Sequence, residues 1–141
     1  MQKPKVLFLC TGNTARSQMA EAWLRKYAGD RMEAFSAGLV PGTIHPFTVS
    51  VMEQAGLDMS QQYSKSLKEY LGKVHFSYLI TVCVKAEEKC PIFPGMGQRL
   101  FWPFEDPAAY QGTDEQRLAK FREIRDLIKD QVLSWLVSID A

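Results

Sequence analysis

The segment from Val6 to Ser17 constrains the fold most, because it predicts a buried strand, a tight loop and a helix in direct succession. The apolar run from Val6 to Leu9 is typical of a strand that is buried on both faces. Apolar residues then recur at helical spacing, at Met19, Ala20, Trp23, Leu24 and Tyr27. Strands and helices that alternate along a chain are expected to build a parallel sheet with helices on both faces.

The loop of this unit reads C-T-G-N-T-A-R-S from Cys10 to Ser17 and has the composition of an anion-binding site. Gly12 and Asn13 readily adopt unusual backbone angles, so that several backbone N–H groups and a helix N-terminus can converge on one concavity. Arg16 adds a rigid fork of donors suited to a tetrahedral oxyanion. This positive field predicts a lowered pKa for the Cys10 thiol and hence a nucleophile near neutral pH. The predicted oxyanion loop comprises Thr11, Gly12, Asn13, Thr14, Ala15 and Arg16.

A simpler interpretation of Cys10 is a buried core thiol at the end of a strand, which is the common role of a single cysteine. Three features together favour the nucleophile. Five residues separate Cys10 from Arg16, the loop residues are small, and the loop joins a strand to a helix.

The composition favours a single domain over residues 1–141. The 141 residues are 46% hydrophobic, enough for one buried core but too few for two ordinary domains. With 17 Lys and Arg against 16 Asp and Glu, the net charge of +1 predicts no attraction to nucleic acid or to an anionic membrane. No apolar run approaches the roughly 20 residues that span a bilayer, and no leader pattern precedes the first strand. We therefore expect a cytoplasmic monomer.

Three further strands and three further helices are expected along the chain. The strands are predicted at Met32–Ser36, Phe76–Val84 and Arg99–Trp102, and the helices from Pro46, after Ser66 and from Thr113, which forms a capping box with Gln116. The stretch from Lys85 to Gly97 is polar and then rich in Pro and Gly, so we expect it to be irregular. The result is a three-layer α/β sandwich with a four-stranded parallel sheet flanked by helices. Ligands bind beyond the carboxyl ends of such strands, where Cys10 and Cys83 are expected to lie.

Two later cysteines, Cys83 and Cys90, form the second candidate cluster. Their spacing differs from that of a zinc knuckle, and only His45 and His75 could join them, so no metal site is expected. Ordinary packing would explain this pair by itself. However, Cys83 ends the strand predicted beside the Cys10 loop, and Cys90 lies in a polar segment. We therefore interpret all three cysteines as redox or catalytic thiols.

These residues resemble one branch of a known superfamily. The segments N-T-A-R-S-Q-M-A-E-A-W, F-S-A-G, G-L-D-M-S, C-P-I-F-P and F-E-D-P, with Cys10, Cys83 and Cys90, are similar to the thioredoxin-coupled arsenate reductases of the low-molecular-weight tyrosine phosphatase superfamily. The resemblance runs through nearly the whole chain and implies a low-molecular-weight phosphatase-like fold. The phosphatases share the loop and the Asp-Pro pair but do not require the two later thiols.

The resemblance implies a reaction with three thiols and no bound cofactor. Cys10 would attack arsenate while Asp106, as general acid, protonates the departing oxygen. Cys83 would then attack the Cys10 sulfur to release arsenite, and Cys90 would attack Cys83. The exposed Cys83–Cys90 disulfide would be reduced by thioredoxin. The segment between the two cysteines must rearrange for this, so we expect a helix or an irregular loop that changes shape on oxidation.

Two other functions stay open at this point. The first is a low-molecular-weight protein tyrosine phosphatase that acts through a Cys10 phosphoenzyme, since phosphate resembles arsenate in shape and charge. Phosphate or sulfate would then bind the same loop as analogues of arsenate. The second is an anion-binding or redox-sensing module without turnover.

Individual residues of the predicted site also have alternative roles. Ser17 is either a plain helix N-cap or a donor to the Cys10 thiolate as well. Asn13 is a turn residue whose side chain could also fix the loop. Asp106 could serve only the turn before Pro107, and Glu105 is its nearest competitor as acid.

Some family members bind a potassium ion near the loop. The resemblance aligns three of its positions with Asn13, Glu21 and Ser36, whereas Lys65 stands where those members have an aspartate. We therefore expect the Lys65 ammonium to take the place of the potassium ion. The alternative is a solvated Lys65, as for most lysines.

Overall fold

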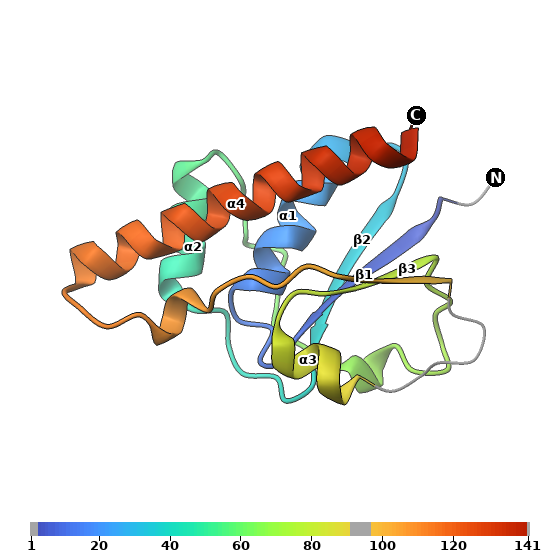
Figure 1. The fold of residues 1–141 in the computed structure, drawn as a ribbon, viewed down its shortest axis with the longest axis horizontal. Helices are drawn as coiled ribbons and strands as arrows, with labels where there is room; N and C mark the ends of the chain where they lie inside the picture. Colours follow the sequence, from blue (N-terminus) through green and yellow to red (C-terminus); the bar gives the residue numbers. More distant parts are fainter. Residues whose placement is uncertain (1–2, 91–96, 141) are drawn as a thin grey trace.

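The computed structural model describes residues 3–90 and 97–140. Its elements in chain order are β1 (Lys5–Cys10), α1 (Arg16–Ala28), β2 (Glu33–Gly38), α2 (Pro46–Gln54), the 3-10 helix η1 (Leu67–Glu69), β3 (Tyr78–Thr81), α3 (Val84–Lys89), β4 (Gln98–Phe101), the 3-10 helix η2 (Pro107–Ala109) and α4 (Asp114–Asp140) (Figure 1). Within the described residues, no helix is both long enough and apolar enough to cross a membrane.

The four strands form one parallel sheet in the order β2-β1-β3-β4. The apolar strand β1 is an interior strand, where Leu7 pairs with Phe35 on one side and with Leu79 on the other. Residues Val6 to Leu9 are fully buried, as a strand covered on both faces requires. The predicted four-stranded parallel sheet flanked by helices is confirmed.

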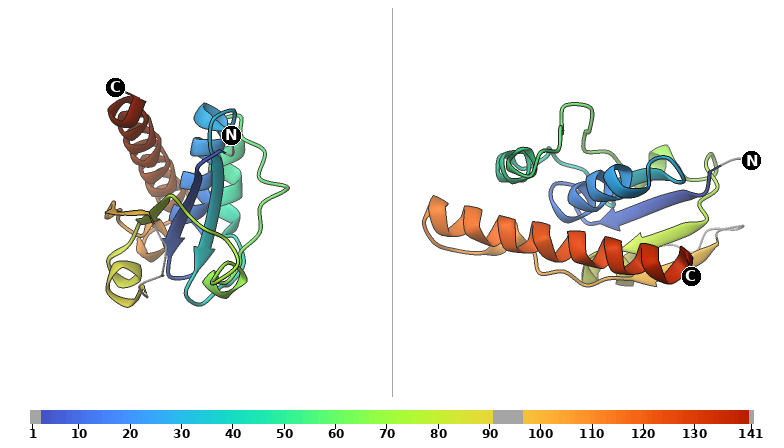
Figure 2. Two further views of the ribbon diagram at one scale, coloured as in Figure 1. Left: turned by 90° about the vertical axis from the view of Figure 1, so that its right-hand side faces the viewer. Right: turned by 90° about the horizontal axis from the view of Figure 1, so that it is seen from above.

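Helical elements cover both faces of the sheet (Figures 1 and 2). On one face, Trp135 of α4 packs edge-on against Tyr78 and Trp102, with ring centroids 5.0 and 5.6 Å apart. On the other face, Phe35 packs against Tyr70 and Phe76, in both cases at 5.4 Å. Helices α1 and α4 lie on the first face and pack against each other, and α3 lies below the sheet in Figure 1.

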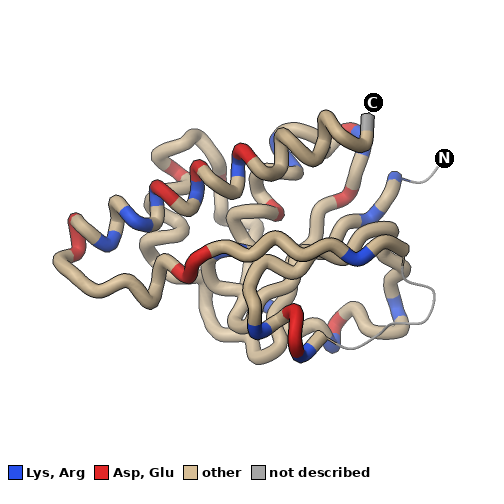
Figure 3. The backbone as a smooth tube through the Cα atoms, in the orientation of Figure 1, with Lys and Arg blue, Asp and Glu red and all other residues tan. Residues whose placement is uncertain are grey.

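The local helix signals hold in the structure. Pro46 opens α2, and Ser66 caps η1 by accepting a hydrogen bond from the Lys68 N–H. Thr113 and Gln116 exchange the two hydrogen bonds of a capping box at the start of α4. Acidic and basic residues are interspersed along α4 (Figure 3).

The predictions of the three further strands are wrong at both ends, and β4 is shifted by one residue to Gln98–Phe101. β2 continues to Gly38, because each of its residues pairs with β1 up to the partnership of Cys10 with Gly38. β3 ends at Thr81, so Cys83 lies beyond the strand. There the Cys83 sulfur accepts a hydrogen bond from the Ala86 N–H at 3.4 Å and caps a new helix.

The irregular structure predicted from Lys85 onward is therefore wrong up to Lys89, which lies in α3. The expectation of a helix or loop between Cys83 and Cys90 is met by this helix. The remainder of the predicted irregular stretch, residues 91–96, lies outside the described residues and includes most of the C-P-I-F-P segment.

Candidate active site

The loop between β1 and α1 presents its backbone N–H groups to one concavity, because its carbonyl oxygens are bonded on the outer side. Backbone N–H groups of the segment after β2 donate to these oxygens: Leu39 to Cys10 (3.2 Å), Val40 to Thr11 (2.9 Å), Gly42 to Gly12 (3.2 Å) and His45 to Thr14 (3.1 Å). The C=O and N–H of a trans peptide point in opposite directions, so outward carbonyls leave the amides facing inward. Inward-facing amides beside the N-terminus of α1 are the arrangement that an anion-binding loop requires.

Gly38 permits this arrangement, although the sequence does not single it out. A Cβ atom at this position would lie 2.8 Å from the Thr11 oxygen and 2.9 Å from the Asn13 nitrogen. Only a residue without a side chain can bring the end of β2 so close to the loop. Its place within the F-S-A-G segment is the one sequence signal for this role.

Asn13 holds the loop and orients Ser17. It is fully buried, with a φ of 55°, and its side-chain oxygen accepts hydrogen bonds from the Lys65 N–H and the Gln18 amide, both at 2.9 Å. Its side-chain nitrogen donates to the Ser17 hydroxyl at 2.7 Å. The Ser17 oxygen thus accepts from Asn13, and its own proton is available to the Cys10 sulfur 2.8 Å away.

Ser17 is not the N-cap of α1. Ala15 occupies that position and offers no capping side chain, while Ser17 is the second residue of the helix. The hydroxyl is therefore the hydrogen-bond partner of the Cys10 sulfur, which is the second of the two roles that the sequence allows.

The predicted direction of the Cys10 pKa is wrong. Burial raises the pKa of this thiol above its ordinary value. The hydrogen bonds from Ser17 and Asn13 and the charge of Arg16 lower it but do not compensate for the burial. The loop thus provides the positive field expected from the sequence, yet it also excludes water from the sulfur, and the loss of solvation is the larger effect.

Arg16 joins the loop to the Asp-Pro segment. One guanidinium nitrogen donates to the Phe104 oxygen at 3.0 Å, and the other lies 3.8 Å from an oxygen of Asp106. The second oxygen of Asp106 accepts a hydrogen bond from the Ala108 N–H at 3.0 Å. This carboxylate is therefore held at the edge of the loop and stays partly exposed.

Glu105 points elsewhere. Its carboxylate lies 3.4 Å from the ammonium of Lys120 on α4. Of the two acidic residues in the F-E-D-P segment, the structure brings only Asp106 to Arg16.

Cys83 lies beside the same loop. Its sulfur is 3.5 Å from the hydroxyl of Thr11, and it is buried, as is Cys10. Cys90 lies at the other end of α3, also buried, and all three cysteines are thiols. Burial raises the pKa of Cys90, the charge of Arg99 lowers it, and that of Glu87 raises it. The structure thus brings two of the three thiols to the carboxyl end of the sheet and separates the third by one helix.

Lys65 lies inside the structure, so the solvated alternative is wrong. Its side chain is 5% exposed, and its ammonium donates to the Tyr63 oxygen at 2.8 Å. The same nitrogen lies 3.5 Å from the Ser36 hydroxyl and 3.7 Å from the Glu21 carboxylate. Burial lowers the pKa of Lys65, and the charge of Glu21 opposes this effect. Within residues 3–90 and 97–140, no group of three or more His, Cys, Asp or Glu residues could hold a metal ion.

Sequence reasoning missed two polar side chains that support the loop. The Gln18 amide donates to both oxygens of Asn13, and the Ser64 hydroxyl donates to the Gly12 oxygen at 3.0 Å. Gln18 directly follows the loop motif, which could have indicated its role. Ser64 lies 52 positions beyond Gly12, and no local pattern predicts their contact.

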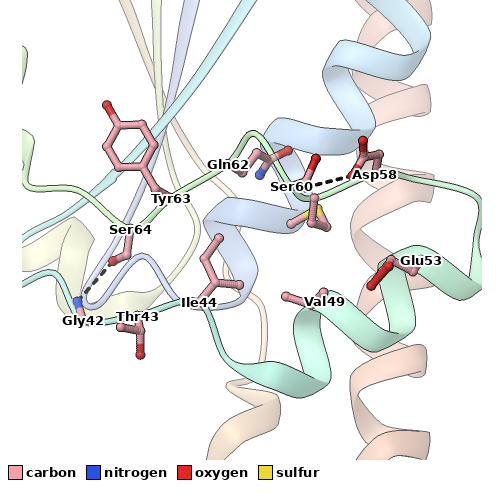
Figure 4. A pocket seen from close by; sticks show the side chains of 11 residues that line it. Gly42, Thr43, Ile44, Val49, Glu53, Asp58, Ser60, Gln62, Tyr63 and Ser64 are labelled. Carbon is pink, nitrogen blue, oxygen red and sulfur yellow. Dashed lines mark hydrogen bonds between the residues drawn. The ribbon is translucent and has the colours of Figure 1, made fainter.

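A pocket of about 490 Å³ lies next to the loop-supporting residue Ser64, which is one of its lining residues (Figure 4). Gly42, Ile44, Val49, Met59 and Tyr63 contribute to its walls, and Figure 4 shows the hydrogen bond between Gly42 and Ser64 at its edge. Its lining includes none of the predicted catalytic side chains, all of which belong to the described chain.

The chain matches a known protein family over almost its whole length. Residues 5–141 match the family described as low molecular weight phosphotyrosine protein phosphatase. The chain belongs to this family.

Within the low molecular weight phosphatase family, the chain is similar to proteins named for arsenate reduction. It is 41% identical over 133 residues to an arsenate reductase of Halalkalibacterium halodurans, with 94% of each chain covered. A solved arsenate reductase in the phosphate binding state has a TM-score of 0.81 and 29% identity, over 96% of this chain and 98% of that one.

A thioredoxin-dependent arsenate reductase of Corynebacterium glutamicum has a TM-score of 0.74 and 31% identity. The match covers 98% of this chain and 62% of the solved one, so the present chain spans less than two thirds of that protein.

Proposed function

We propose that this chain reduces arsenate to arsenite through Cys10, Cys83 and Cys90, with thioredoxin as the reductant. The contact between Thr11 and Cys83 carries the proposal, because it sets a second thiol against the oxyanion loop. The names of its relatives support the substrate, and the Corynebacterium glutamicum protein supports the reductant. A phosphatase of the family needs no such thiol.

The first step forms a bond between Cys10 and arsenic. Because burial raises the pKa of Cys10, the thiol is mainly protonated at neutral pH before the substrate binds. A dianionic arsenate can accept this proton in the loop, which leaves a thiolate and a monoanion with the same total charge. The sulfur then attacks arsenic, and Asp106 in its protonated form donates a proton to the departing oxygen, which leaves as water.

The second step is the reduction itself. The Cys83 thiolate attacks the Cys10 sulfur, and the sulfur–arsenic bond breaks with its electron pair on arsenic. Arsenic is reduced from the +5 to the +3 state, and the two thiols are oxidised to a disulfide. A phosphorylated Cys10 cannot react in this way and can only transfer its group to water.

The third step regenerates Cys10. Cys90 attacks Cys83, and Cys10 leaves as a thiolate. Cys83 and Cys90 flank α3, and a rise of 1.5 Å per residue sets their Cα atoms about 10 Å apart in a helix. A disulfide requires a separation of about 4.4–6.8 Å. Helix α3 therefore unwinds in this step, which exposes the new disulfide to thioredoxin.

Hydrolysis of a phosphomonoester is the second candidate function. It is favoured by the placement of Arg16 and Asp106 at one edge of the loop and by the family's description. The two functions share the first step, so phosphate and sulfate are expected to compete with arsenate.

Coupled turnover separates the two functions. Thioredoxin oxidation that depends on arsenate, and that is lost in Cys83→Ser and in Cys90→Ser, supports the reductase. Efficient phosphotyrosine hydrolysis that survives both substitutions would instead establish the phosphatase. Glutaredoxin in place of thioredoxin tests the choice of reductant in the same assay.

Further parts of the proposal concern the surroundings of the site. The Lys65 ammonium takes the place of a potassium ion between Glu21 and Ser36. Residues 1–141 act as one domain and as a monomer, which sedimentation at several concentrations can test. A cytoplasmic location fits three thiols that must be kept reduced.

A further inference from the structure

Arg99 binds helix α3 to the sheet through Glu87. A guanidinium nitrogen of Arg99 donates to the Glu87 backbone oxygen at 2.7 Å and lies 3.1 Å from one oxygen of its carboxylate. The hydroxyl of Thr81 donates to the other carboxylate oxygen. Glu87 is thus held by side chains from two neighbouring strands.

The sheet register explains this convergence. Thr81 pairs with Phe101 and Leu79 pairs with Arg99 across β3 and β4. Because alternate residues of a strand point to the same face, Thr81 and Arg99 both point to the face that α3 covers. Glu87 is the fourth residue of this helix, three positions before Cys90. Acidic and basic residues lie close together in this region of the chain (Figure 3).

The charges of this cluster also act on Cys90. Arg99 lowers the pKa of the buried Cys90 thiol, and Glu87 raises it. Within residues 3–90 and 97–140, the Arg99 Nε is a buried side-chain nitrogen with no hydrogen-bond acceptor. A thiolate accepts hydrogen bonds. A buried donor that has no acceptor therefore stabilises a thiolate that comes within reach of it.

We propose that Arg99 is a positioning residue of the thiol relay, which clamps α3 through Glu87 and supplies the positive charge against which the Cys90 thiolate forms. The inference rests on the relay proposed above. Cys90 releases its proton to solvent, and its sulfur bonds to Cys83. The Cys10–Cys83 bond breaks with its electron pair on Cys10, and no net oxidation occurs. As α3 unwinds, the Glu87 carboxylate moves away from Arg99. The Arg99 guanidinium then interacts with the Cys90 thiolate.

The test measures the alkylation of Cys90 by iodoacetamide across pH. It uses the full chain with Cys10→Ser and Cys83→Ser, so that Cys90 is the one thiol. The midpoint of the profile reports the charges near the sulfur, whereas the plateau at high pH reports its exposure. A purely structural clamp would change the plateau alone.

Arg99→Gln is expected to move the midpoint to higher pH, so that alkylation below the midpoint slows by about tenfold relative to the plateau. In Arg99→Lys the midpoint is expected to lie close to that of the chain with Arg99. In Glu87→Gln it is expected to move to lower pH. A midpoint unchanged in Arg99→Gln overturns the proposal. If that variant does not fold, as judged by circular dichroism, an unchanged midpoint in Glu87→Gln overturns it instead.

A single turnover with arsenate then tests Arg99 within the relay. In the chain with all three cysteines, Arg99→Gln is expected to accumulate the Cys10–Cys83 disulfide, detected by mass spectrometry of the quenched protein. If this disulfide fails to form in the unmodified chain, the proposed function is wrong. The alkylation result stands or falls independently, because it needs neither arsenate nor thioredoxin.

Discussion

The Thr11 hydroxyl lies 3.5 Å from the sulfur of Cys83, although 72 positions separate the two residues in the chain. The sheet produces this contact, because β1 and β3 are neighbours and the Val82 N–H still bonds to the Leu9 oxygen, at 2.9 Å, beyond the last paired residue of β3. The order of the strands therefore places the Cys83 thiol beside the oxyanion loop, and α3 begins directly after this residue.

Thr11→Val is expected to slow the attack of Cys83 on Cys10 by roughly 3- to 10-fold. The substitution keeps the shape of the side chain and removes one hydrogen bond, worth about 0.5–1.5 kcal/mol. Rapid quench and mass spectrometry after addition of arsenate measure the rate at which the Cys10–Cys83 disulfide forms. Thr43→Val is the matched control, since Thr43 is exposed and outside the loop. Equal rates in the two variants would contradict a role for the Thr11 hydroxyl.

Ser17→Ala is expected to raise the pKa of Cys10 further, since its hydroxyl is the largest of the groups that oppose burial. A hydrogen bond to a charged group is worth about 1.5–3 kcal/mol, so alkylation of Cys10 near pH 7 should slow by roughly 10- to 100-fold. The assay uses a chain with Cys83→Ser and Cys90→Ser. Ser138→Ala, on α4, is the control and should leave the rate unchanged.

The same shift predicts how stability depends on pH. A thiol with a raised pKa in the folded state contributes stability that is full below the pKa of the unfolded chain and is lost as the pH rises through the folded pKa. Ser17→Ala widens the pH range between the pKa of the unfolded chain and that of the folded chain. The free energy of unfolding of this variant should therefore fall more than that of the unmodified chain between neutral and alkaline pH. Urea denaturation at several pH values measures both, and parallel curves would contradict the sign.

The sequence predicts the parts of the site that are contiguous or locally signalled, and contacts at long range decide the rest. Cys10 to Ser17 form one contiguous segment from the end of β1 to the start of α1, and its turn residues and flanking apolar patterns lie within a few positions. Gly38 and Ser64 reach the same loop only because β2 and a later segment return to it. The pKa of Cys10 was predicted with the wrong sign for a related reason, since charge can be read from residue types but burial depends on the fold.

Asp106→Asn is expected to reduce turnover by roughly 100- to 10,000-fold if it removes the proton donor. Glu105→Gln is the matched control, because the neighbouring carboxylate pairs with Lys120 and not with Arg16. The measurement is hydrolysis of an aryl phosphate across pH, which reports the shared first step. Loss of the pH dependence in Glu105→Gln, with Asp106→Asn unaffected, would assign the acid to Glu105.

Gly38→Ala is expected to weaken oxyanion binding and to destabilise the protein by about 1–3 kcal/mol, as overpacking does. The added methyl group would lie within 2.9 Å of three backbone atoms of the oxyanion loop, which cannot yield without a shift of the loop. At Gly42, the nearest atom to such a methyl group is the Thr14 side chain at 3.6 Å, so Gly42→Ala is the control. Calorimetric titration with phosphate and thermal unfolding measure the two effects. Similar affinities in both variants would mean that the loop adapts.

Lys65→Asp is expected to make the protein dependent on potassium. The ammonium lies against Glu21 and Ser36, and Glu21 also pairs with Arg25. Removing one partner of a buried ion pair costs about 3–5 kcal/mol, and a second carboxylate beside Glu21 adds repulsion that a bound cation relieves.

Thermal unfolding in potassium and in sodium chloride at equal ionic strength measures this dependence. The unmodified chain should unfold at the same temperature in both salts, whereas Lys65→Asp should be destabilised in sodium and partly restored by potassium. Lys68→Asp makes the same charge change at an exposed position of η1 and should respond to neither salt. A stabilisation specific to potassium in the unmodified chain would show that Lys65 does not take the place of the ion.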